Sequence, residues 1–230
     1  MALKLITAPL VEPVSVEEVR LFLRLDEDPV EQDGLIRNMI AGARAEAETR
    51  TSRQLITAIW ELYLDVFSTH PRHKIPGPNQ GLSASWPYGY LPDHDFLWHR
   101  HGHSGQTLHI PLPPLQSITS ITYLDAAGSL QTLAPSAYRV DAASTPGRVT
   151  PAYGTTWPAT YPVTNAVVIR FKAGFGDTAA AVPIKIIQWI KAMVGSMWEN
   201  RETVMVSPTT LTQVELGFLD GLLDDFRWSW

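Results

Sequence analysis

The spacing of hydrophobic residues predicts helices near both ends of the chain. In "VEEVRLFLRL", Val16, Val19 and Leu23 recur at helical spacing. Ser15 precedes this segment and Glu18 follows three positions later, which is the pattern of a capping box. A second, longer helix is predicted over residues 31–51, where apolar or small residues recur every four positions: Leu35, Met39, Ala43 and Ala47.

The C-terminal part of the sequence returns to helical spacing. Pro183 suits the first position of a helix, and "IKIIQWIKAMVGSMWENRE" follows it. That segment is apolar on most sides, so we expect much of it to be buried. Closer to the chain end, a short apolar stripe is formed by Leu219, Leu222, Leu223 and Phe226.

Between the helices, hydrophobic and polar residues alternate as they do in β-strands. "TAIWELYLDVF" alternates around Ile59, Glu61 and Tyr63 and predicts a half-buried strand. Six further short strands are predicted in "TLHIPL", "ITSITYLD", "LQTL", "AYRVD", "GRVTP" and "AVVIRFKAG". The "DAAG" that follows Leu124 predicts a hairpin turn in which Gly128 takes a positive φ.

This order of elements predicts an α+β fold, because helices and strands are segregated along the chain. We expect a helical bundle built from the N- and C-terminal segments, with a small antiparallel β domain inserted between them. The predicted boundaries are residues 1–54, 55–174 and 175–230. Within the β domain, residues 68–105 are rich in Pro, Gly, His and aromatics and predict one long loop.

Composition narrows the classes of function. The chain has 230 residues, 45% hydrophobic and 18% charged, which is ordinary for a globular domain. Without cysteine it can form neither disulfides nor thiolate metal sites. We expect no signal peptide and no membrane span, because no long apolar run occurs. A net charge of −5 argues against a protein that grips nucleic acid through phosphates.

The histidines are the main candidates for metal chemistry. All seven lie in the predicted loop and the strand after it, and His99, His101 and His103 alternate. In an extended segment these three share a face and could bind zinc or nickel. No HExxH pair accompanies them, and the nearby acids are only Asp93 and Asp95. We therefore expect a surface loop without metal or cofactor, with a metal-dependent enzyme as the alternative.

Motifs of other enzymes are absent. "AGFGD" has two glycines of a nucleotide-binding fingerprint but lacks the third, and predicts a turn. "GLSAS" lacks the glycine that a nucleophile elbow needs after its serine. We expect the protein not to be an enzyme.

Two segments have alternative interpretations. Between Glu12 and Asp33 there are eight carboxylates and two arginines, which form either a solvated helical face or a functional acidic patch. The terminal "FRWSW" contains aromatic residues that either fold back on their own helices or contact a partner, since Trp and Arg are enriched at interfaces.

Three passages together resemble one family. They are "PPLQSITSITYLDAAGSLQTLAPSAYRVD", "RVTPAYGTTWPAT" and "RFKAGFGDTAAAVPIKIIQWIKAMVGSMWENRE". In this order they resemble the head–tail connector, or adaptor, proteins of tailed double-stranded DNA phages and gene transfer agents. The opening "ITAPLVEPVSVEEVRLFLRL" and the helix after it are similar to the N-terminal helical pair of that family. Residues 68–105 depart from the resemblance, because this segment is longer than the family leads us to expect.

The resemblance implies a structural protein of the virion. Members form a ring, usually of twelve copies, that docks on the portal protein and receives the next connector or tail-terminator protein. DNA passes through the ring without specific binding. The expected location is the head–tail junction, after assembly in the host cytoplasm. Another connector layer, such as a stopper or tail-completion protein, is the alternative.

The resemblance also suggests contact residues. The C-terminal segment would reach the portal, through Leu222, Leu223, Phe226, Arg227, Trp228 and Trp230. An acidic lumen repels DNA phosphates and lets the duplex slide. The candidates for channel-facing acids are Glu17, Glu18, Asp26, Glu27 and Asp28.

Overall fold

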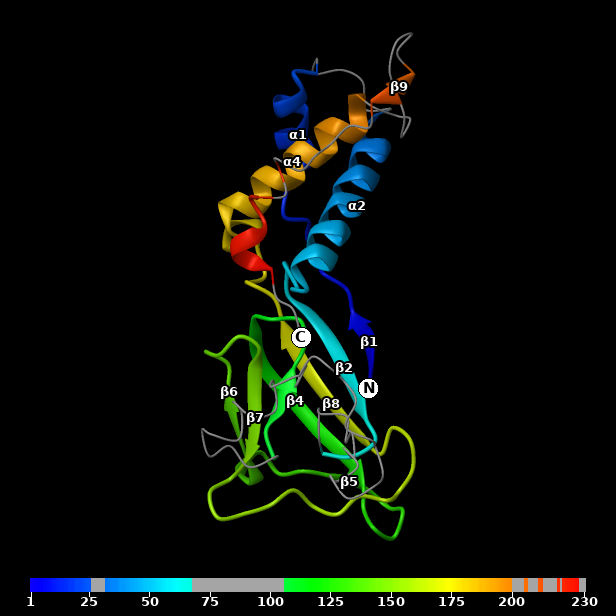
Figure 1. Ribbon diagram of the computed structural model, residues 1–230, viewed down its shortest axis with the longest axis vertical. Helices are drawn as coiled ribbons and strands as arrows, with labels where there is room; N and C mark the ends of the chain where they lie inside the picture. Colours follow the sequence, from blue (N-terminus) through cyan, green and yellow to red (C-terminus); the bar gives the residue numbers. More distant parts are fainter. Residues whose placement is uncertain are drawn as a thin grey trace, which may run out of the picture.

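The computed structural model is elongated, with helices at one end and β-sheets at the other (Figure 1). It describes residues 1–25, 32–67, 106–199, 205–206, 211–212, 219 and 221–227. The predicted α+β class is confirmed, because helices and antiparallel sheets form separate parts of the molecule. No helix in these described ranges is both long enough and apolar enough to cross a bilayer.

In the described part of the chain, the helical end contains the α-helices α1 (Val16–Leu23), α2 (Asp33–Thr51) and α4 (Ile184–Glu199). The α1 start is as predicted, since Ser15 Oγ accepts a hydrogen bond from the Glu18 N–H at 3.1 Å. The α4 helix begins one residue after Pro183, whose carbonyl accepts from the Ile186 N–H. The helices share one core, with these fully buried members: Val19, Ile36, Ile40, Ala43, Ala47, Ile186, Trp189, Ile190 and Val194.

The buried face of α2 differs from the prediction in its first two turns. Ile36 and Ile40 are buried there, whereas Leu35 is 42% exposed and Met39 is half-buried. Ala43 and Ala47 are buried as predicted. Both sets of residues recur every four positions, so periodicity alone could not choose between two neighbouring faces.

Replacing Ile36 by alanine should lower the free energy of unfolding by about 2 to 4 kcal/mol, because a fully buried side chain leaves a cavity. The matched change Leu35→Ala should cost less than about 1 kcal/mol, since much of that side chain is already in water. Urea denaturation of both variants measures the difference. Equal losses would contradict the observed rotation of α2.

The β end is a five-stranded antiparallel sheet packed against a three-stranded one (Figure 1). The larger sheet has the order β1-β2-β8-β4-β5 and the smaller one β3-β7-β6. The larger sheet contains β1 (Ala2–Thr7), β2 (Ala58–Leu64), β8 (Val167–Ala173), β4 (Leu115–Leu124) and β5 (Leu130–Thr132). The smaller contains β3 (Leu108–Ile110), β7 (Gly147–Pro151) and β6 (Tyr138–Asp141). All seven predicted strands are present.

The core between the sheets follows the predicted alternation. Leu62 and Leu64 of β2 face inward, while Glu61 and Tyr63 lie on the opposite face, where Glu61 binds Arg170. The "DAAG" turn joins β4 to β5 as predicted, with Gly128 at φ 80°. Asp125 holds this turn by accepting hydrogen bonds from the N–H groups of Ala127 and Ser129.

The strand β1 was not predicted. Residues 1–54 were expected to be helical, yet Ala2–Thr7 pairs with β2 and belongs to the β end. All six residues of β1 are exposed, including Leu3, Leu5 and Ile6. Only Leu3, Lys4 and Leu5 alternate before Ile6 breaks the pattern, so the period-2 signal is too short to identify the strand.

The remaining described elements are short. Three 3-10 helices span Pro135–Ala137, Ala179–Ala181 and Asp224–Phe226 (η2, η3 and η4). The two-residue strands β9 (Met205–Val206) and β10 (Leu211–Thr212) pair with each other beyond α4.

Candidate interaction surfaces

The two ends of the molecule are joined where three chain segments meet. The Gln54 N–H donates to the Pro113 carbonyl, and the Gly174 N–H donates to the Pro114 carbonyl. The Phe175 N–H donates to the Leu55 carbonyl. The predicted turn at "AGFGD" lies here, and its role is to bring β8 across the chain that leaves α2. We call this region the junction.

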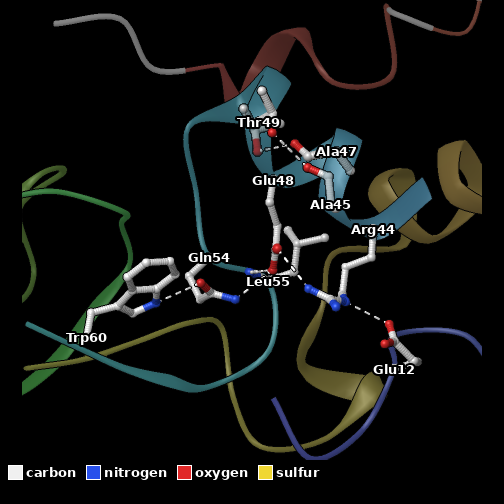
Figure 2. A network of polar contacts seen from close by, with 10 residues as sticks. Glu12, Arg44, Ala45, Ala47, Glu48, Thr49, Gln54, Leu55 and Trp60 are labelled. Atoms are coloured by element: carbon white, nitrogen blue, oxygen red, sulfur yellow. Dashed lines mark hydrogen bonds and ion pairs between the residues drawn. The ribbon is translucent and has the colours of Figure 1, made fainter. Parts of the chain in front are cut away.

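A polar network reinforces the junction (Figure 2). Arg44 on α2 contacts Glu12 at 2.7 Å and Glu48 at 2.9 Å. Glu48 Oε1 accepts hydrogen bonds from Gln54 Nε2 and from the Leu55 N–H, and Trp60 Nε1 donates to Gln54 Oε1. The network therefore runs from the segment before α1, through α2, to β2.

Sequence reasoning missed this network. The only local signal is the spacing of Arg44 and Glu48, which are four residues apart on one helix. The other partners are Glu12, Gln54 and Trp60, and they become neighbours only in the folded chain.

Burial controls the protonation of the network. Burial raises the pKa of the Glu48 carboxyl above its ordinary value of 4.5, although the Arg44 guanidinium and the Leu55 N–H act in the opposite direction. Burial alone would lower the pKa of Arg44, but its contacts with Glu12 and Glu48 outweigh burial and raise that pKa. Arg44 therefore keeps its positive charge in the junction.

The raised pKa of Glu48 makes a prediction about pH. Just above pH 4.5 the folded chain holds this proton more tightly than the unfolded chain does. The free energy of unfolding therefore falls as the pH rises through the window between the unfolded and folded pKa values. The variant Glu48→Gln cannot titrate there, so wild type should lose stability relative to it over that window. Urea denaturation at several pH values measures the difference, and a relative gain in wild-type stability would contradict the assignment.

The C-terminal segment 221–227 packs against the helical end. Leu223 is fully buried in the helical core, and Leu222 and Phe226 pack against that core. Arg53 Nε donates to the Phe226 carbonyl at 2.7 Å, and Lys185 pairs with Asp225. The segment is thus held by apolar packing, by a hydrogen bond and by an ion pair.

This packing changes the predicted set of partner-contact residues. Leu223 needs correction, because its side chain is part of the chain's own core and anchors the segment. The side chains of Leu222 and Phe226 are half-buried, and that of Arg227 is exposed. Trp228 and Trp230 lie outside the described residues.

Several acids of the N-terminal segment are paired with cations from other helices. Glu18 lies 3.3 Å from Lys191 of α4, and Asp33 lies 2.6 Å from Arg20. The carboxyl of Glu17 is exposed, and hydrogen bonds from its own backbone and from Ser15 lower its pKa. Asp26, Glu27 and Asp28 lie outside the described residues. In the described part of this segment, ion pairs therefore offset some of the negative charge that the sequence suggests.

The predicted metal ligands His99, His101 and His103 also lie outside the described residues. Within the ranges that the structure describes, no three His, Asp or Glu side chains are grouped so as to hold a metal ion. His109 lies on β3, where it is opposite Arg148 of β7.

Among the described residues, exposed apolar side chains include a group on α1 and a group on β1. On α1, Leu21 is 82% exposed and Phe22 lies beside Gly195 of α4. The strand β1, described above, lies at one edge of the larger sheet. Sites where proteins associate commonly expose apolar groups of this kind.

The comparisons with known proteins agree with the resemblance found in the sequence. Residues 13–79 match the model of a family described as phage gp6-like head-tail connector protein. A search of the curated proteins found no match to this chain.

Among solved structures, the chain is similar to one in the neck of an empty GTA particle computed with C6 symmetry. The TM-score is 0.68 at 21% identity, over 100% of this chain and 96% of that chain. A chain in the virion of a native gene transfer agent particle has a TM-score of 0.67 at 20% identity, with the same coverage. A chain in the neck of a native GTA particle computed with C12 symmetry has a TM-score of 0.62 at 20% identity, again with the same coverage.

These comparisons cover different parts of the chain. The family model matches α1, α2 and the start of the β end, whereas the structural similarity extends over both ends of the molecule. The family model at residues 13–79 thus confirms the predicted resemblance to head–tail connector proteins, and the solved structures show that the fold is shared over the whole chain.

Proposed function

We propose that this protein is a structural head–tail connector of a tailed double-stranded DNA phage or a gene transfer agent. The observation that carries the proposal is the similarity of the whole chain to chains in GTA necks, together with the connector-family match at residues 13–79. The protein acts by binding other virion proteins, and no catalytic step is needed for this role.

The connector works as a ring at the head–tail junction. The C12 symmetry of one similar neck supports a ring of twelve copies. Each copy offers one surface to the next, so the interface is heterologous and closes by rotation. A ring that meets a ring makes many contacts at once, so each single contact can be weak. The helical bundle forms the ring wall, and the inserted β domain projects from it.

The partners are the portal on one side and the next connector or tail-terminator protein on the other. The C-terminal segment carries the portal contact, through Leu222, Phe226, Arg227, Trp228 and Trp230. Its support is that the packing of Leu223 and the Arg53 hydrogen bond hold residues 221–227 against the helical end.

The channel-facing acids remain part of the proposal. The exposed Glu17 carboxyl is the best candidate among the described residues, because Glu18 is paired with Lys191. The change Glu17→Lys should slow DNA ejection from particles, since a lumenal cation attracts phosphates. Ejection followed by dye release at low and high salt measures this. Unchanged ejection rates at both salt concentrations would show that Glu17 does not face the channel.

The proposed function is tested by removing the protein from the particles. Cells that lack the gene should accumulate DNA-filled heads without tails, and the purified protein should restore tail attachment in their lysates. Normal tailed particles in the absence of the protein would contradict a connector role.

A further inference from the structure

Among the described residues, no strand pairs with the outer side of β1, and part of the β4 edge is also unpaired. On one side, β1 is the last strand, and all six of its residues are exposed. On the other side, β5 covers β4 at Thr122–Leu124, and the N–H of Leu133, which follows β5, donates to the Ile121 carbonyl. In the described part of the chain, no strand pairs with Gln116–Ser120 across that edge, and Gln116, Ser117 and Thr119 are exposed. An open edge presents unpaired N–H and C=O groups that can accept another strand.

The two open edges lie at the same height in the sheet. Following the register from strand to strand, Lys4 pairs with Glu61, Glu61 with Arg170, and Arg170 with Ser120. By the same steps, Leu3 is level with Ile121 and Leu5 is level with Ile118. The uncovered stretch of β4, whose register shifts at Gln116 and at Thr119, is therefore level with residues 4–7 of β1. Leu3 is level with Ile121, whose carbonyl already accepts from the Leu133 N–H.

The faces of the two edges also match. Residues directly opposite each other in an antiparallel sheet point to the same side. Leu3 and Leu5 are thus on the same face as Ile121 and Ile118, which pack in or against the β core. Lys4 and Ser120 share the other, polar face. A strand placed beside β4 at the same height would bring apolar side chains together on one face and polar side chains together on the other.

The strand directions are compatible as well. Each neighbouring pair in the order β1-β2-β8-β4 is antiparallel, so β1 and β4 run in opposite directions (Figure 1). A rotation about an axis along the strands keeps both the height and the direction of every strand. Such a rotation brings β1 of one copy antiparallel to β4 of the next, without the shift along the axis that would open the ring.

We infer that β1 of one copy adds to the open edge of β4 in the next copy, so that the larger sheets continue from subunit to subunit. The inference rests on the proposed function, because it requires copies arranged in a closed ring. Residues 4–7 of β1 form the added part of the strand, which gives the exposed Leu5 a partner. The interface is heterologous, with β1 as donor and β4 as acceptor.

A disulfide test is direct, because the natural chain contains no cysteine. The variant Lys4→Cys, Ser120→Cys places one thiol on each edge. Within one chain these positions are three strand spacings apart, roughly 14 Å, which is too far for a disulfide. Across the inferred interface they are directly opposite, about 5 Å apart between Cα atoms. Every disulfide therefore reports a contact between copies.

Oxidised rings of the double variant should give a ladder of covalent oligomers on a denaturing gel, in purified protein or in assembled particles. The two single variants should stay monomeric, and so should the control Lys4→Cys, Leu130→Cys on β5, whose two positions would be roughly 13 Å apart across the interface. A covalent dimer of Lys4→Cys alone would overturn the inference in favour of a symmetric β1–β1 contact. Rings seen by electron microscopy without a ladder would overturn it and leave the connector role standing. If no rings formed and the particles did not contain the protein, both this inference and the proposed connector role would be overturned.

Discussion

Replacing Gly174 by alanine should destabilise the protein by roughly 3 kcal/mol or more, because strain and a steric clash coincide at this residue. Gly174 has φ 134°, a conformation that residues with a Cβ rarely adopt. A Cβ there would lie 2.7 Å from the backbone of Ile56 and Thr57. Backbone atoms of the junction cannot move aside as a flexible side chain can, so β8 would have to separate from the chain that leaves α2.

Gly42 provides the matched control. It lies inside α2, and a Cβ added there meets nothing within 4 Å. Gly42→Ala should therefore stabilise the protein by about 0.5 to 1 kcal/mol through helix propensity. Urea denaturation of the two variants should give effects of opposite sign. A Gly174→Ala variant as stable as wild type would show that the junction is not built as described.

The second large effect is expected at Leu223. Leu223→Ala should lower the free energy of unfolding by about 2 to 5 kcal/mol, as for other fully buried leucines. The loss also weakens the attachment of the C-terminal segment, where Phe226 meets Phe175 edge-to-face and accepts the hydrogen bond from Arg53. The segment should then become sensitive to protease under native conditions.

The neighbouring variant Asp224→Ala is the matched control for Leu223→Ala. Asp224 is exposed, so its replacement should change stability by less than about 0.5 kcal/mol and leave protease resistance intact. Denaturation and limited proteolysis of both variants measure the contrast. If Leu223→Ala were as resistant and as stable as Asp224→Ala, Leu223 would not be the anchor.

Much of the fold follows from local patterns in the sequence. The strands that face the β core alternate, and α4 is apolar on most sides, so periodicity finds them. The strand β1 has no buried face, and its alternation is limited to residues 3–5, which is too short a signal. On α2, the residue types at two neighbouring faces are similar, and only the packing of the helical core places Ile36 inside.

The candidate contact surfaces are harder to predict. Leu222 and Leu223 are adjacent leucines near the chain end, yet one is half-buried and the other is a core residue, because η4 turns the chain after them. The junction network joins residues that are far apart in sequence, such as Glu12 and Arg44. Charge counting predicted an acidic N-terminal segment, but it could not foresee that Lys191 of α4 would pair with Glu18.

The connector role is tested most directly by mixing the purified protein with its portal ring, sedimenting the mixture, and viewing the pellet end-on by electron microscopy. We predict that the protein sediments with the portal and adds a second ring of matching rotational symmetry. A protein that stays in the supernatant, with isolated portal and with DNA-filled heads alike, would contradict a connector that docks on the portal.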